Sequence, residues 1–166
     1  MQNTDYFKGK KVTVIGLARS GLACANLLYE LGSKVSVSDN QDNPSVRSNA
    51  KGLRSADIAL ELGGHSEKFI RGSELVILSP GVSGSSPAVT MAERLGIPMI
   101  SEVEFAFLLC PAKVIAITGT NGKTTVATLV GKILKAWGRN VFVCGNIGTP
   151  FSAEVPKMSE EDFAVV

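Results

Sequence analysis

The sequence predicts an α/β fold built on parallel sheets. Short runs of β-branched and aliphatic residues alternate with segments of helical periodicity, and Gly, Pro, Asp or Asn follows each of the four clearest runs within two residues. Strands of parallel sheets appear as continuous apolar runs, because helices cover both faces. We therefore expect strands at 12–15, 35–38, 75–78 and 114–117, and further strands at 58–62, 99–100, 141–143 and 163–166.

The helices are predicted from apolar residues that recur every three or four positions. Such spacing gives a helix one apolar face that can pack on a sheet. It occurs at 24–31, 88–95 and 126–137, and a further helix is expected at 103–109. The first three are followed by Gly32, Gly96 and Gly138. Glycine is suited to this position because it closes the last turn with a positive φ and no Cβ penalty.

Composition limits the classes of function. The chain has 166 residues, of which 45% are hydrophobic and 19% are charged, which is enough apolar material for a buried core. A net charge of +2, spread along the chain, predicts no nucleic-acid partner. The longest stretch without charged residues, 75–92, is broken by Gly and Pro, and residues 1–5 lack the pattern of a secretory signal. We therefore expect no membrane partner, a cytoplasmic location and a monomer.

The cysteines and the single histidine predict no metal centre. Three cysteines without a CxxC pair indicate neither a disulfide framework nor a zinc site, and we interpret them as small buried hydrophobic residues. His65 has no second potential ligand at metal-binding spacing and is expected in a surface loop.

A domain boundary is predicted at Pro111. Proline follows the helix expected at 103–109, and a new strand begins almost at once. Residues 1–111 then form a Rossmann-like, doubly wound parallel sheet. Residues 112–166 then form the start of a second α/β domain. Because such domains usually need on the order of 100 residues, we expect this second domain to be incomplete.

The first candidate phosphate loop runs from Gly16 to Gly21, after the strand at 12–15. Gly16 permits a sharp turn, Gly21 lets the next helix approach the sheet, and free backbone N–H groups favour an anion. Ala18 replaces the middle glycine of the dinucleotide fingerprint and leaves less room for a pyrophosphate. Asp39, at the end of the next strand, can accept hydrogen bonds from a ribose or a base. The alternative is a tight turn in which Asp39 merely caps the following segment.

The second candidate phosphate loop is Thr118–Thr125, between a strand and a long helix. Gly122 lets the backbone wrap a phosphate, Lys123 can reach β/γ oxygens, and Thr124 offers a hydroxyl to Mg²⁺. Ile117 stands where the general motif has its first glycine, and Gly119 compensates. The sequence predicts a triphosphate site formed by Gly119, Thr120, Asn121, Gly122, Lys123, Thr124 and Thr125. Residues 112–166 are therefore expected to be the start of a P-loop type α/β ATPase domain.

The motif Thr118-Gly-Thr-Asn-Gly-Lys-Thr-Thr125 resembles the phosphate loop of the Mur ligases, ATP-dependent amide-forming enzymes of peptidoglycan precursor synthesis. The other motifs stand in the order found in the D-glutamate-adding branch of that family. They are 16–22 with Asp39, Ser79-Pro-Gly-Val82, Ile97-Pro-Met-Ile100 with Glu102-Val-Glu104, and Gly145-Asn-Ile-Gly148. Folylpolyglutamate synthetases share the second loop, usually with GKGS. The resemblance covers essentially the whole chain, but only the first part of a three-domain architecture.

The resemblance implies a substrate, an acceptor and cofactors. The substrate is UDP-N-acetylmuramoyl-L-alanine, the acceptor is D-glutamate, and the cofactors are ATP and Mg²⁺. In the implied reaction the substrate carboxylate attacks the γ-phosphorus of ATP, and the amine of D-glutamate displaces the acyl phosphate. Lys123 and Thr124 take the catalytic roles, with Thr124 at the metal. The implied substrate-binding residues are Gly16, Arg19, Ser20, Gly21, Asp39, Asn40, Ser79, Gly81 and Asn146.

We expect the 166 residues to be inactive as a ligase by themselves. The family's metal-binding carboxylate, its later lysine and histidine, and its amino-acid-binding domain have no counterpart in the sequence. Three alternatives stay open: a Mur-type ligase for a different amino acid, an NAD-binding Rossmann oxidoreductase, and a non-catalytic nucleotide-binding module. Ala18 and the second loop weigh against the oxidoreductase.

Overall fold

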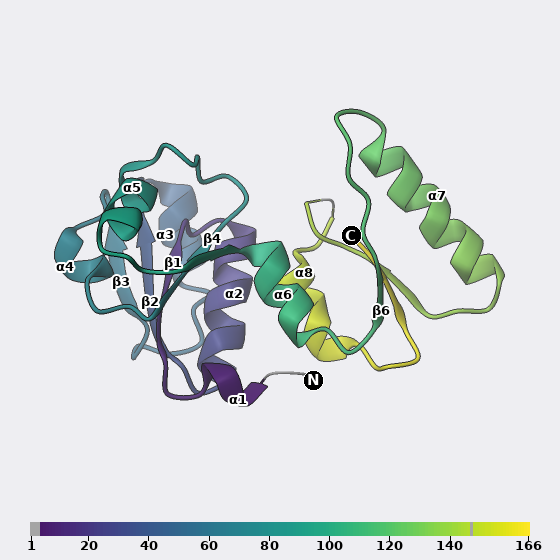
Figure 1. Cartoon of the computed structure of the whole chain (residues 1–166), viewed down its shortest axis with the longest axis horizontal. Helices are drawn as coiled ribbons and strands as arrows, with labels where there is room; N and C mark the ends of the chain where they lie inside the picture. The colour runs from purple at the N-terminus through teal and green to yellow at the C-terminus, as the bar shows by residue number, and fades with distance from the viewer. Residues whose placement is uncertain (1–3, 147) are drawn as a thin grey trace.

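The computed structural model describes residues 4–146 and 148–166, which form two parallel sheets (Figure 1). The first sheet has the order β3-β2-β1-β4-β5 and the second the order β6-β8-β7. The strands are β1 (Lys11–Ile15), β2 (Lys34–Asp39), β3 (Ala59–Leu62), β4 (Leu75–Leu78), β5 (Met99–Ser101), β6 (Lys113–Ile115), β7 (Val141–Val143) and β8 (Phe163–Val165). All pairings are parallel, which confirms the predicted fold class.

The predicted helices correspond to α2 (Arg19–Glu30), α5 (Pro87–Arg94), α6 (Glu102–Leu109) and α7 (Lys123–Ala136). The glycines after α2, α5 and α7 have φ of 78°, 66° and 76°, as their capping role requires. Shorter elements were not predicted: α1 (Thr4–Phe7), α3 (Pro44–Ala50), α4 (Glu67–Ile70), α8 (Phe151–Glu154) and the 3₁₀ turn η1 (Val155–Lys157). Within the described ranges, no helix is both long enough and apolar enough to cross a membrane.

The order of the first sheet creates a crevice at one end. The chain passes from β1 to β2 and β3 on one side, then returns to β4 and β5 on the other. Thr13 of β1 consequently pairs with Ser36 of β2 and with Val76 of β4. Sheets of this kind bind ligands beyond the carboxyl ends of the strands where the winding reverses. Here that position is the loop that follows β1.

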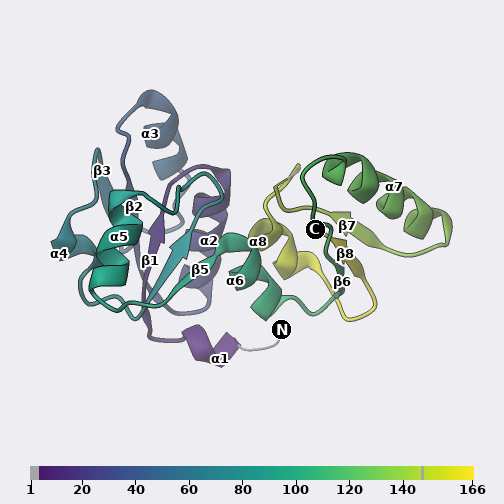
Figure 2. The same ribbon diagram turned by 45° about the horizontal axis from the view of Figure 1, so that its top comes forward.

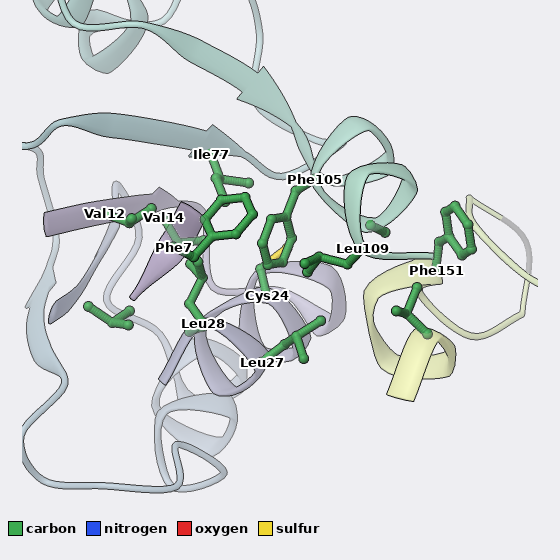
Figure 3. Packing of buried hydrophobic residues seen from close by; sticks show 14 of the residues in the cluster. Phe7, Val12, Val14, Cys24, Leu27, Leu28, Ile77, Phe105, Leu109 and Phe151 are labelled. Atoms are coloured by element: carbon green, nitrogen blue, oxygen red, sulfur yellow. The ribbon is translucent and has the colours of Figure 1, made fainter. Parts of the chain in front are cut away.

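The main core lies between the first sheet and helices α2 and α6 (Figure 3). The rings of Phe7 and Phe105 meet edge to face at 5.1 Å, beside the buried Leu28 of α2. We call the parts before and after the predicted boundary at residue 111 the first and the second unit. The same cluster continues into the second unit through Phe151 and Val155, because α8 packs on both α2 and α6. The predicted boundary at residue 111 falls in the link between α6 and β6, and it stays a prediction.

The second sheet packs on one face of α7. Gly131 makes this approach possible, because a Cβ there would lie 2.5 Å from a methyl carbon of Val143. Another face of α7, together with the residue after its end, exposes an apolar stripe with exposed fractions of 46–66%, formed by Val126, Leu129, Ile133 and Trp137. Figures 1 and 2 both show α7 at the outer end of the molecule.

Candidate functional site

A hollow of about 270 Å³ lies beyond the carboxyl ends of β1, β2 and β4. Five of the predicted substrate-binding residues line it: Gly16, Asp39, Asn40, Ser79 and Gly81. The other lining residues are Ala18, Gln41, Asn43, Ser45, Val46, Asn49 and Val82. The structure therefore brings together parts of the chain that are more than sixty residues apart.

The first loop is held by packing against the turn after β4. Gly16 has φ of 89°, and its N–H donates to Ser38 O at 2.7 Å. The hydroxyl of Ser79, a 6% exposed residue, donates to Gly16 O at 2.9 Å. A Cβ on Gly21 would lie 1.8 Å from that same carbonyl oxygen. Only glycine at position 21 lets α2 start so close to the loop.

Asp39 ties the end of β2 to this loop. Asp39 is 8% exposed, and its Oδ2 accepts a hydrogen bond from Leu17 N at 2.7 Å. Its Oδ1 accepts from Gln41 N at 2.8 Å. The carboxylate thus shapes the hollow and also lines it. Each oxygen keeps a lone pair beyond its one backbone bond, with which it can accept from a ligand.

Four predicted substrate residues lie outside the lining of the hollow. Arg19 and Ser20 are the first residues of α2, and Arg19 is exposed. Gly21 is buried beneath the loop. Asn146 is exposed after β7 of the second sheet, and its neighbour Ile147, part of the predicted Gly145–Gly148 motif, lies outside the described residues.

The segment around α3 supplies lining residues that sequence reasoning missed. The side chain of Asn43 caps α3 by accepting from Val46 N at 3.0 Å. Asn49 Nδ2 donates to Leu17 O at 2.8 Å and so connects α3 to the first loop. The Asn43-Pro44 pair is a helix-start signal, because asparagine suits the N-cap and proline the first helical position. That signal could have located α3 at the rim of the site.

His65 lies in a loop, as expected, but it is half-buried and contacts the end of β2. Its Nδ1 lies 2.7 Å from Ser38 Oγ. Burial lowers the pKa of His65, against the opposing charges of Asp39 and Glu61. The same loop donates Gly64 N to Asp39 O at 3.2 Å. His65 therefore belongs to the structure that supports Asp39.

The second loop is exposed along its whole length, 118–125. Gly119 and Gly122 have φ of 147° and 78°, and nothing lies within 4 Å of a Cβ on Gly122. Helix α7 begins at Lys123 without a side-chain cap, so N–H groups of its first turn are open to an anion. Lys123 Nζ donates to the carbonyl oxygens of Gly119 and Thr120. The loop has the free donors and the cation that a phosphate needs.

The fit to Mg²⁺ is limited to one ligand. Thr124 is exposed in the first turn of α7, where its hydroxyl can meet a cation held by phosphate oxygens. Within residues 4–146 and 148–166, no three His, Cys, Asp or Glu side chains are grouped to hold a metal. Any Mg²⁺ here would depend on nucleotide oxygens and water for its other ligands.

A larger hollow, of about 570 Å³, lies over the amino-terminal parts of β1 and β2. It is lined by Thr13, Ser36 and exposed basic side chains such as Lys11 and Lys34. Its place is opposite to the carboxyl ends where such sheets bind ligands. We therefore assign the candidate site to the smaller hollow.

Comparison with known families gives two matches. Residues 10–101 match the family described as "Mur ligase MurD-like, N-terminal domain", and residues 117–165 match "Mur ligase middle domain". A relative from Koribacter versatilis is 40% identical over 159 residues, which cover 96% of this chain and 35% of the relative. One from Chloroherpeton thalassium is 43% identical over 166 residues, with 98% and 35% covered. Both are named "UDP-N-acetylmuramoylalanine--D-glutamate ligase".

Solved structures agree in fold. A pseudomurein peptide ligase type C from Methanothermus fervidus aligns with a TM-score of 0.55 at 28% identity, over 95% of this chain and 32% of that chain. A murein peptide ligase from Psychrobacter arcticus aligns with a TM-score of 0.56 at 18% identity, over 95% and 37%, and shows the fold alone. The chain spans about a third of the length of the curated relatives. With a MurD-like match over more than half of its residues and a middle-domain match after it, the chain belongs to the Mur ligase family.

Proposed function

We propose that the chain forms the uridine-nucleotide pocket and the ATP loop of a ligase that adds D-glutamate to UDP-N-acetylmuramoyl-L-alanine in peptidoglycan precursor synthesis. The proposal rests on one observation. The MurD-like first unit has a polar hollow where the winding of its sheet reverses, and a loop of the middle-domain type follows that unit in the sequence. Relatives named for this reaction are 40–43% identical to the chain, which favours D-glutamate over other amino acids.

In this proposal the hollow holds the uridine end of the substrate. Asp39 accepts hydrogen bonds from the nucleoside, Asn40 donates or accepts them, and the backbone around Gly81 lies along the pyrophosphate. Helix α2 starts at Arg19 without a side-chain cap, so the N–H groups of its first turn favour a phosphate. Arg19 and Ser20 act from that helix start, at the edge of the hollow.

The second loop would bind ATP. Lys123 would exchange the neutral carbonyl oxygens of Gly119 and Thr120 for charged phosphate oxygens, which form stronger hydrogen bonds. The N–H groups at the start of α7 would stabilise charge on the transferring phosphoryl group, as positioned donors do in phosphoryl transfer. Mg²⁺ near Thr124 would supply further charge compensation.

Calorimetric titration of the 166-residue protein tests the uridine site. We expect UDP-N-acetylmuramoyl-L-alanine to bind and NADH not to bind, and Asp39→Asn to weaken the uridine ligand. Asp42→Asn is the matched control, because Asp42 is exposed, pairs with Arg47 and lies outside the lining. Binding of NADH without the UDP ligand would instead support an oxidoreductase. ADP release that depends on D-glutamate, catalysed by these 166 residues alone, would contradict the proposal that they form only the nucleotide-binding part of the ligase.

A further inference from the structure

A buried carboxylate lies where the two units meet. Glu102 is the first residue of α6, directly after β5, and it is 1% exposed. Its Oε1 accepts two hydrogen bonds from Ser152 of α8, from N at 2.8 Å and from Oγ at 2.7 Å. Its Oε2 is buried without a hydrogen-bond partner among the described residues. The carboxylate therefore joins elements fifty residues apart through one oxygen.

The surroundings of Glu102 give the carboxylate few other partners. Burial raises the pKa of the Cys24 thiol, the charge of Glu102 raises it further, and a hydrogen bond with Ser152 opposes both. Cys24 of α2 thus lies beside the pair as a neutral thiol. A carboxylate in such a place costs free energy unless donors compensate it. The two donors of Ser152 are the compensation, so separation of α8 from α6 would leave the charge unpaired.

This contact lies close in the sequence to a candidate substrate residue. Asn146 lies six residues before Ser152, and Gly145, the residue before Asn146, donates its N–H to Thr149 O at 2.9 Å. Helix α8 packs on α2 and α6, and both views show α6 and α8 between the two sheets (Figures 1 and 2). Apolar contacts alone would let α8 shift along α6. Two charge-assisted hydrogen bonds to one oxygen fix the orientation and the register of α8 against α6. The Glu102–Ser152 pair therefore sets where the segment after β7 lies on the first unit.

We propose that Glu102 is a positioning residue that holds α8, and with it Asn146 and the second sheet, in one arrangement relative to the uridine-nucleotide hollow. The part that concerns the two units stands by itself. The part that concerns Asn146 and a UDP-linked ligand rests on the proposed function. Glu102 itself touches neither loop in the hydrogen bonds described above.

The arrangement of the units can be measured as a distance between spin labels. Ser48→Cys on α3 and Lys132→Cys on α7 place labels at exposed positions, whereas the native cysteines are buried. We expect a narrow distance distribution in the parent protein. Glu102→Gln and Ser152→Ala should each broaden it under conditions where circular dichroism stays native.

Glu104→Gln is the matched control, because Glu104 is exposed on the same helix and should leave the distribution unchanged. If Glu102→Gln fails to fold, Ser152→Ala, which removes only one donor, carries the test. An unchanged width in the folded variants would overturn the proposal.

A double-mutant cycle between Glu102 and Asn146 tests the ligand part. In the parent protein Asn146→Ala should weaken UDP-N-acetylmuramoyl-L-alanine about tenfold, as loss of a hydrogen bond to a charged ligand does. In the Glu102→Gln background the same change should cost less than about twofold, because Asn146 is already misplaced. Additive effects would overturn the positioning of Asn146. If the parent protein binds no UDP ligand, the proposed function fails, and the distance measurement still decides the role of Glu102.

Discussion

The two candidate phosphate loops of this chain are built on opposite principles. The loop at Gly16 is enclosed, because Ser79 and Asp39 bond to it and α2 presses on it. The loop at Gly119–Thr125 is open, and its lysine bonds only to carbonyl oxygens of the loop itself. The more specific sequence motif thus lies in the less packed region. Hydrogen bonds and packing from other parts of the chain hold the first loop, whereas the hydrogen bonds of Lys123 stay within the second loop.

The largest expected effect concerns the glycines of the two loops. Gly21→Ala would place a Cβ 1.8 Å from Gly16 O, and the backbone must move to admit it. We expect a loss of about 3 kcal/mol or more in the free energy of unfolding, at the upper end for overpacking. At Gly122 a Cβ has no neighbour within 4 Å, so only the positive φ of 78° opposes alanine. Gly122→Ala should therefore lower the free energy of unfolding by about 1 kcal/mol.

Urea unfolding followed by circular dichroism measures both glycine variants. Gly84→Ala is the control, because Gly84 has neither a close neighbour nor a positive φ. Equal losses for Gly21→Ala and Gly122→Ala would show that the first loop is no more tightly packed than the second.

A smaller effect is expected at the carboxylate that closes the first loop. Asp39→Asn replaces one oxygen by an amide that opposes a backbone N–H, Leu17 N or Gln41 N. We expect a loss of about 2 kcal/mol in the free energy of unfolding, as for hydrogen bonds to a charged group. Asp42→Asn should change stability by less than about 0.5 kcal/mol, because its ion pair with Arg47 is exposed. Similar values for both variants would mean that Asp39 does not brace the loop.

The second unit has its own buried carboxylate, which predicts a pH dependence. Asp162 is 6% exposed, and its pKa is held below the ordinary 3.8 mainly by Ser159 N, against burial, with further hydrogen bonds from Asn140 and Ser159 Oγ. Because the pKa is lower in the folded state, its stabilisation is complete well above pH 3.8 and is lost as the pH falls below it. Asp162→Asn should cost about 1 kcal/mol at pH 7. The melting temperatures of Asp162→Asn and the parent protein should converge as the pH falls towards 2. A difference that stays constant with pH would contradict this.

Apolar periodicity was enough to predict the sheets and the long helices. It overextended the strand at 114–117, because β6 ends at Ile115, where its partner β8 ends at Val165. It missed α8, a four-residue helix too short to show a period. The place of α8 depends on Glu102, fifty residues earlier, and no local pattern reveals such a contact.

Sequence analysis predicted the lining of the hollow only where a residue of a suitable type stands at the carboxyl end of a predicted strand. Gly16 and Ser79 follow strands, Asp39 ends one, and all three line the hollow. Asn43 and Asn49 also contribute, but a polar run looks the same whether it faces a ligand or only solvent. Sequence reasoning therefore found the residues at the ends of strands and missed those that α3 brings to the rim.

The smallest effect on stability, and the sharpest contrast with Asp39, is expected at Lys123. Its ammonium contacts only exposed carbonyl oxygens, so Lys123→Ala should change the free energy of unfolding by less than about 0.5 kcal/mol. If the second loop binds ATP as proposed, the same change should remove the cation that would face the phosphates and should weaken ATP·Mg²⁺ binding, measured by calorimetry. Lys132→Ala, on an exposed turn of the same helix, is the control for both measurements. A clear loss of stability in Lys123→Ala would mean that the second loop, like the first, is braced by its own side chains.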